Sequence, residues 1–185
     1  MITYYDIGLN LFTSSFPDPE KIISEAEAAG ICCILTGSEA AENEKVNDFV
    51  KTHAVYGTAG IHPHSADRAE EADLRRIEEI VSSNPKIVAV GECGLDYDRM
   101  YSSKENQLYY FKKLIDLAEK LEKPLFLHQR DAEEDFLACF DGHEEICRRS
   151  VVHCYTGNRE MAEKLIGMGF NLSLINIRRS RRTTL

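Results

Sequence analysis

Several features are absent from this 185-residue sequence, and each absence excludes a class of protein. No apolar run approaches the roughly 20 residues that a membrane-spanning helix needs. The first residues, Met1 to Tyr4, lack the basic and apolar regions of a secretory signal peptide, so we expect a cytoplasmic protein with no membrane partner. There is no surplus of basic residues either. The net charge is −9, which excludes a broadly basic surface that coats nucleic acid.

The six cysteines form no Cys-x-x-Cys pair, and several of them lie in apolar stretches. Free, packed thiols are therefore expected in place of disulfides. Strand alternation also predicts that, if Glu92 and His153 point inward, Cys93 and Cys154 point the other way and are packing residues, not ligands.

Short apolar stretches alternate with amphipathic ones along the chain, with no internal repeat or linker. In the amphipathic stretches apolar residues recur every three or four positions, as in an α-helix. Repeated strand–helix units predict a parallel sheet, either open or closed into a barrel. The predicted strands are residues 3–8, 31–36, 55–61, 87–91, 125–128, 150–153 and 171–175. The predicted helices are residues 19–29, 42–53, 68–83, 104–121, 132–140 and 158–168.

The number of predicted strands indicates the architecture. Seven is too many for a small open sheet and one fewer than an eight-stranded (β/α) barrel, which usually needs about 250 residues. We therefore expect one domain over residues 1–175, an incomplete TIM-barrel-like parallel (β/α) barrel. Residues 176–185 contain four arginines, and we expect them to be a disordered or non-native tail.

Three histidines and a glutamate lie at the ends of predicted strands or directly after them. They are His62, Glu92, His128 and His153. Each alone has an ordinary structural explanation, such as a hydrogen-bonded core histidine or a solvated loop glutamate. The carboxyl ends of parallel strands, however, meet at one face, where active sites form. Together these residues predict the inner ligands of a metal site and hence a metallohydrolase.

Several neighbouring residues give weaker signals. His64 follows His62 across a proline, and the pair fits a polar loop as well as a site. Arg130 beside His128 can bind a phosphate or balance Asp131. Asp131 is expected to cap the following helix.

Five motifs carry a family resemblance. They are DIGLNL at residues 6–11, AGIHPH at 59–64, GECGLDY at 91–97, HQRDA at 128–132 and HCYTG at 153–157. In this order they resemble the TatD family of metal-dependent deoxyribonucleases, which are amidohydrolase-like TIM barrels. The resemblance implies 3′–5′ exonuclease action on DNA, with single strands or 3′ ends as substrate. It implies that Glu92, His128 and His153 are metal ligands and that His62 and His64 lie near the scissile phosphate.

The chain departs from the family pattern in two places. Many members carry a His-x-His pair where this chain has Gly8 and Asn10, which leaves Asp6 and Asn10 as candidate first-strand site positions. Family members also continue to a Thr-Asp-x-Pro segment, whereas this chain ends in the basic tail. An altered reading frame or a truncated product would explain that ending. Activity is then expected to be weakened.

The expected mechanism uses one or two divalent ions, with Mg²⁺ favoured and Mn²⁺ or Zn²⁺ as alternatives. Glu92 and His62 are the candidate catalytic residues, while His62, His64 and Arg130 are candidates for binding the substrate. Two alternatives stay open: an aminoacyl-tRNA deacylase that uses the same site, and an inactive remnant. Unclosed sheet edges at residues 3–8 and 171–175 would favour self-association.

Overall fold

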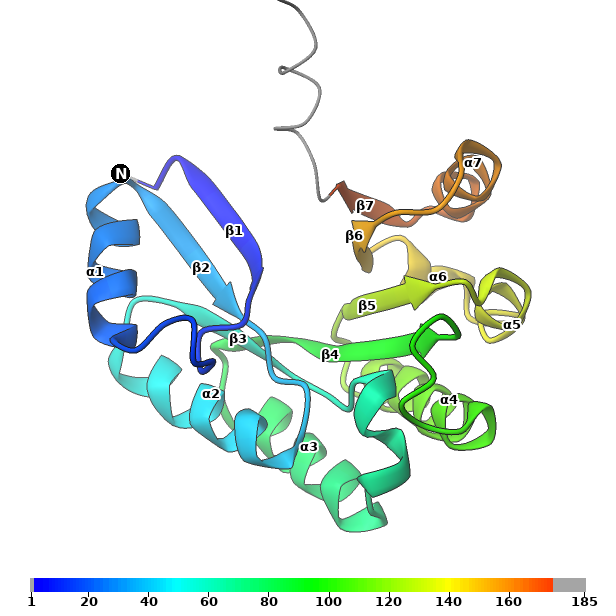
Figure 1. Cartoon of the computed structure of the whole chain (residues 1–185), viewed down its shortest axis with the longest axis horizontal. Helices are drawn as coiled ribbons and strands as arrows, with labels where there is room; N and C mark the ends of the chain where they lie inside the picture. The colour runs from blue at the N-terminus through cyan, green and yellow to red at the C-terminus, as the bar shows by residue number, and fades with distance from the viewer. Residues whose placement is uncertain (1, 175–185) are drawn as a thin grey trace, which may run out of the picture.

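A single curled parallel sheet organises the fold, as Figure 1 shows for this computed structural model, which describes residues 2–174. The strands follow one another in the sheet in chain order, and every neighbouring pair is parallel. This curled half-barrel confirms the predicted incomplete TIM-barrel-like architecture. The strands are β1 (Tyr4–Leu9), β2 (Ile31–Leu35), β3 (Tyr56–Ala59), β4 (Ile87–Asp96), β5 (Leu125–Arg130), β6 (Val151–Tyr155) and β7 (Asn171–Leu174).

The helices lie outside the curve of the sheet (Figure 1). Asp18 caps the first of them by accepting a hydrogen bond from the Lys21 backbone N–H at 3.1 Å. Gly169 ends the last one in a left-handed conformation, with φ at 100°. The helices are α1 (Pro19–Ala28), α2 (Ala40–Thr52), η1 (Pro63–Arg68, a 3₁₀-helix), α3 (Glu71–Ser83), α4 (Lys104–Lys120), α5 (Glu133–Ala138), α6 (Glu144–Cys147) and α7 (Arg159–Met168).

Two local predictions were wrong, and one short helix was not predicted. Asp131 does not cap α5, because its own φ is 51° and Ala132 occupies the cap position without a side-chain hydrogen bond. The short helix α6 was not predicted, because its four residues are too few to show apolar positions recurring with the helical period. Cys154 is exposed, with φ at 48°, although Cys93 is buried and all six thiols are free.

The strand β4 is longer than its apolar stretch suggested. It was predicted to end at Gly91 but continues to Asp96, with a register irregularity against β5 between Gly91 and Cys93. Glu92 therefore lies within the strand, as His128 and His153 lie within β5 and β6. Glycines and carboxylates in this stretch hide the strand because both are uncommon in strand interiors.

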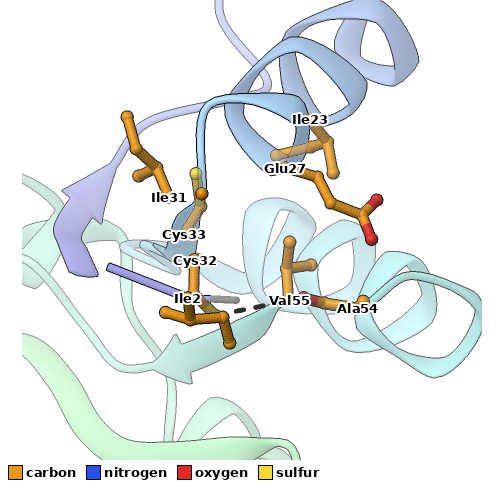
Figure 2. Close-up of a pocket in the computed structure, with 9 residues that line it drawn as sticks. Ile2, Ile23, Glu27, Ile31, Cys32, Cys33, Ala54 and Val55 are labelled. Atoms are coloured by element: carbon orange, nitrogen blue, oxygen red, sulfur yellow. Dashed lines mark hydrogen bonds between the residues drawn. The ribbon is translucent and has the colours of Figure 1, made fainter. Parts of the chain in front are cut away.

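The amino-terminal end of the sheet contains an apolar cavity of about 150 Å³ (Figure 2). Ile23 and Glu27 of α1 lie over the start of β2, and the Cys32 thiol donates to the Ala54 carbonyl at 3.9 Å. This end of the sheet is opposite to the carboxyl ends of the strands, where the metal site is predicted. Within residues 2–174, no helix is long and apolar enough to cross a membrane, and the cytoplasmic location stays a prediction.

The edge strand β1 gives a first testable prediction. Within the described residues β1 pairs only with β2, and Tyr4 and Tyr5 are 67% and 61% exposed. Because an exposed, apolar strand edge is a template for pairing with another chain, we expect the 185-residue chain to self-associate. Tyr5→Lys should shift it toward monomer in size-exclusion chromatography, while Tyr109→Lys on α4 should not. A wild-type chain that stays monomeric at all concentrations would contradict the prediction.

Candidate metal centre

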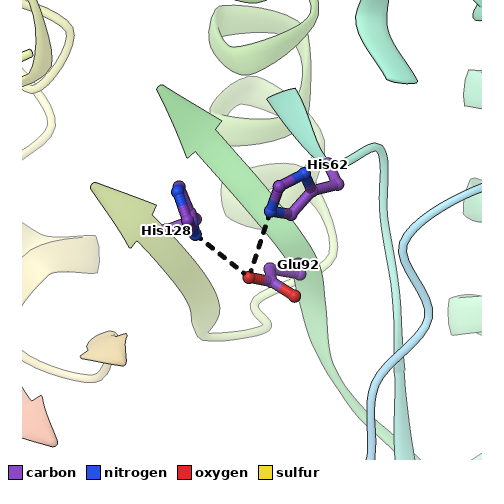
Figure 3. A group of neighbouring side chains, drawn as sticks. All are labelled: His62, Glu92 and His128. Atoms are coloured by element: carbon purple, nitrogen blue, oxygen red, sulfur yellow. Dashed lines mark ion pairs between the residues drawn. The ribbon is translucent and has the colours of Figure 1, made fainter. Parts of the chain in front are cut away.

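Three imidazoles, from β5, β6 and the segment after β3, surround one carboxylate oxygen of Glu92 in β4. Oε1 of Glu92 lies 2.5 Å from His153 Nε2, 3.3 Å from His128 Nδ1 and 3.4 Å from His62 Nε2. Figure 3 shows the imidazoles of His62 and His128 pointing at this carboxylate from the segment after β3 and from β5. Parallel pairing of β3 to β6 brings these residues to the same end of the sheet.

Glu92 is held in the sheet by its backbone as well as by its side chain. Its N–H donates to the Gly37 carbonyl at 2.8 Å, and only 5% of the residue is exposed. A carboxylate buried this deeply is costly unless charge or hydrogen bonds compensate for it. Hydrogen bonds from the three imidazoles provide that compensation.

A second buried carboxylate, Asp96, was not among the predicted site residues. Its Oδ2 lies 2.8 Å from His64 Nε2 and 3.1 Å from His128 Nε2, and only 1% of the residue is exposed. Strand alternation could have identified it, since Glu92 and Asp96 are four positions apart and therefore share a face of an extended strand. The prediction that the strand ended at Gly91 concealed this relation.

His128 connects the two carboxylates. Its Nδ1 faces Glu92 and its Nε2 faces Asp96, so both ring nitrogens have a carboxylate partner. A histidine that binds a metal through one nitrogen usually has its other nitrogen fixed by such a partner. The Asp96–His128 pair has that arrangement.

The protonation states of these groups suit a cation. Burial raises the pKa of Glu92, but hydrogen bonds from His128, His153 and His62 outweigh it and hold this pKa well below its usual value. Burial lowers the pKa of His62, despite the opposing effect of Glu92, so its neutral form is favoured. For Asp96, hydrogen bonds from the Arg99 backbone and His64 overcome burial and lower the pKa. The site therefore combines ionised carboxylates with the imidazole of His62, whose favoured neutral form can donate a lone pair.

The donor geometry fits a bound metal ion. The ligand atoms of His62, Glu92 and His128 all lie within 4.8 Å of one another. The strand pattern predicted all four residues as ligands, and the family resemblance implied Glu92, His128 and His153. Both groupings share the Glu92 oxygen, because His153 contacts it as well.

The remaining predicted residues lie around this cluster. His64 contacts Asp96, and Arg130 pairs with Asp98 at 2.8 Å, where the sequence had suggested Asp131 as its counterion. Asp6 and Asn10 are exposed, and within residues 2–174 no hydrogen bond or ion pair joins either of them to Glu92.

The first strand nevertheless faces the site. A β-carbon built on Gly8 would lie 3.7 Å from His153 Nδ1 and 2.8 Å from the Phe126 ring. The position where many family members carry a histidine thus adjoins the cluster.

Comparison with known proteins agrees with this architecture. Residues 5–184 match the family model described as TatD related DNase. The chain belongs to the TatD family. The match extends into the basic tail, beyond the five motifs that suggested the family.

Relatives in this family resemble the chain over most of its length. The 3′-5′ ssDNA/RNA exonuclease TatD of Erwinia amylovora is 38% identical over 177 residues, which cover 92% of this chain and 67% of the relative. The enzyme of the same name from Erwinia billingiae is 37% identical, with 66% of its length covered. The chain thus spans about two thirds of the length of the TatD exonucleases that it matches.

Solved structures of TatD proteins share the fold. The TatD family hydrolase of Entamoeba histolytica superposes with a TM-score of 0.79 at 25% identity, covering 94% of this chain and 65% of that one. YJJV, a TatD homologue from Escherichia coli, superposes with a TM-score of 0.80 at 22% identity, covering 91% of this chain and 66% of that one. These superpositions support the half-barrel assignment.

Proposed function

We propose that this chain is a divalent-metal-dependent hydrolase of phosphodiester bonds that removes nucleotides from the 3′ end of single-stranded DNA. The observation that carries the proposal is the buried, ionised Glu92 surrounded by three imidazoles at the carboxyl end of the sheet. Membership of a metal-dependent family whose relatives are named as ssDNA/RNA exonucleases supports it.

Glu92, His128 and His153 are the proposed ligands, with one or two divalent ions. A divalent cation would generate hydroxide from water at neutral pH and neutralise charge on the phosphoryl oxygens. Mg²⁺ is the ion favoured from the sequence, whereas the imidazole nitrogens of the cluster suit Mn²⁺ or Zn²⁺ better. A comparison of the three ions is therefore part of the test.

The surrounding residues bind and orient the substrate. His64 is held by Asp96, so its imidazole is fixed before the substrate arrives. Arg130 is half exposed and pairs with Asp98 through one Nη atom, which leaves other guanidinium donors for a phosphate oxygen. His62, whose neutral form is favoured, borders the Glu92 carboxylate and is proposed to act on the water or the leaving oxygen.

The experiment uses a single-stranded DNA oligonucleotide with a 5′ label and protein freed of metal by a chelator. Added Mg²⁺ or Mn²⁺ should give a ladder that shortens from the unlabelled 3′ end, and the chelated protein should give none. A charged tRNA is assayed in parallel, because metal-dependent release of its amino acid without DNA degradation would favour the deacylase alternative. If neither the DNA nor the charged tRNA is hydrolysed with any of the three ions, the chain is an inactive remnant.

A further inference from the structure

The loop between β4 and α4 carries exposed apolar surface beside the candidate metal centre. Met100 and Tyr101 are 42% and 61% exposed, and they are neighbours in this loop. Exposed large apolar side chains that adjoin a polar site often mark a binding surface.

The loop is held rigidly at both ends by one buried side chain. Gln107 of α4 accepts from the Asp96 N–H at 2.9 Å and donates to the carbonyls of Asp96 and Ser102 at 3.2 and 2.9 Å. Oδ1 of Asp96 also accepts from the backbone N–H groups of Asp98 and Arg99. Tyr101 therefore projects from a preorganised backbone, so little ordering is needed when a ligand binds.

Tyr101 lies directly beside a proposed substrate-binding histidine. Its ring centroid is 4.8 Å from that of His64, and the two planes are at 80° to each other. His64 in turn contacts Asp96, whose other oxygen fixes the start of the loop. The edge-to-face contact leaves the tyrosine as an aromatic platform next to the place proposed for the phosphate.

We propose that Tyr101 stacks on an unpaired base of the nucleic-acid substrate close to the cleaved phosphodiester. This inference rests on the proposed nuclease function and adds a residue that selects single strands. Aromatic side chains stack on any base, because every base has a π face. Inside a duplex both faces of a base are covered by its neighbours, so a base there can stack on Tyr101 only where the strands are separated or frayed. Tyr101 is thus a binding residue that favours strands whose base is present and unpaired.

The test compares Tyr101→Ala and Tyr101→Phe with the wild-type full chain on a single-stranded DNA oligonucleotide. Tyr101→Ala should raise KM about tenfold with kcat within about twofold, since stacking in the bound state is uniform binding. Tyr101→Phe keeps the ring and should behave as wild type. Tyr109→Ala, which removes an exposed tyrosine from α4, is the matched control and should change neither constant.

A second set of oligonucleotides identifies the contact. Each of the last three nucleotides is replaced in turn by an abasic one, and the KM ratio of Tyr101→Ala to wild type is measured again. For one of these substrates Tyr101→Ala and wild type should have the same KM, because the base that stacks on Tyr101 is missing. A ratio that persists on all three, or a loss confined to kcat, would mean that Tyr101 only supports His64 and would overturn the inference.

Failure of this inference is distinct from failure of the proposed function. If wild type degrades the oligonucleotide and Tyr101→Ala does so with the same KM, only the stacking role is refuted. If wild type neither binds nor degrades the oligonucleotide with any of the three ions, both are refuted.

Discussion

Replacing Glu92 by Gln is expected to remove divalent-cation binding and to lower nucleotide release by more than about a hundredfold. Loss of an outer hydrogen-bond partner alone costs roughly 10- to 100-fold in metal affinity or activity, and Glu92 is a proposed ligand. The amide keeps the size of the side chain but removes the charge at the point where three imidazoles meet. Binding can be measured from the loss of the free Mn²⁺ signal in electron paramagnetic resonance. Activity is measured as shortening of the 5′-labelled oligonucleotide.

The matched control is Glu163→Gln, which neutralises an exposed carboxylate on α7 that pairs with Arg159. It should bind Mn²⁺ and degrade DNA as wild type does. Both variants should melt cooperatively, so that a loss of activity is not a loss of fold. Undiminished DNA degradation by Glu92→Gln would show that the activity arises elsewhere in the molecule or from a contaminating nuclease.

Gly94→Ala is expected to destabilise the folded chain by several kcal/mol, in the range of about 3–5. Gly94 has φ at 142°, a conformation that is open essentially only to glycine. A β-carbon there would lie 1.8 Å from the His128 carbonyl oxygen, so β4 and β5 would have to separate. Because those strands carry Glu92 and His128, the site would be disrupted together with the sheet.

The unfolding midpoint in urea measures this effect. The control is Gly142→Ala, where φ is 83° but no atom lies within 4 Å of the new β-carbon. It should cost only about 1 kcal/mol, the penalty of a left-handed backbone without a clash. Equal midpoints for the two variants would contradict the close approach of β4 and β5 at Gly94.

The strand–helix alternation and most of the site could be predicted from the sequence, because both depend on local pattern. Apolar stretches predicted the seven strands found within residues 2–174, and the polar residues at or just after their predicted ends include His62, Glu92, His128 and His153. Asp96 was missed because the two glycines of β4 interrupt its pattern. These glycines allow β4 to approach β5 closely, and a contact between two strands cannot be read from the local sequence of one of them.

Pairing between side chains was harder to predict than their presence. For Arg130 the sequence suggested either a phosphate or its neighbour Asp131 as partner, whereas in the structure Arg130 pairs with Asp98 from the loop after β4. Likewise the sequence allowed His64 to be either a polar loop residue or a site residue, and its contact with Asp96 is visible only in the structure. Both contacts join segments about 30 residues apart, and only the fold brings those segments together.

Anomalous scattering from a crystal grown or soaked with Mn²⁺ tests the central claim most directly, since it locates the ion without relying on activity. A peak bounded by Glu92, His128 and His153, with nitrogen and oxygen ligands at ordinary coordination distances, is the predicted result. A crystal with no peak at these residues at saturating Mn²⁺, or with its only peak elsewhere, would contradict the account.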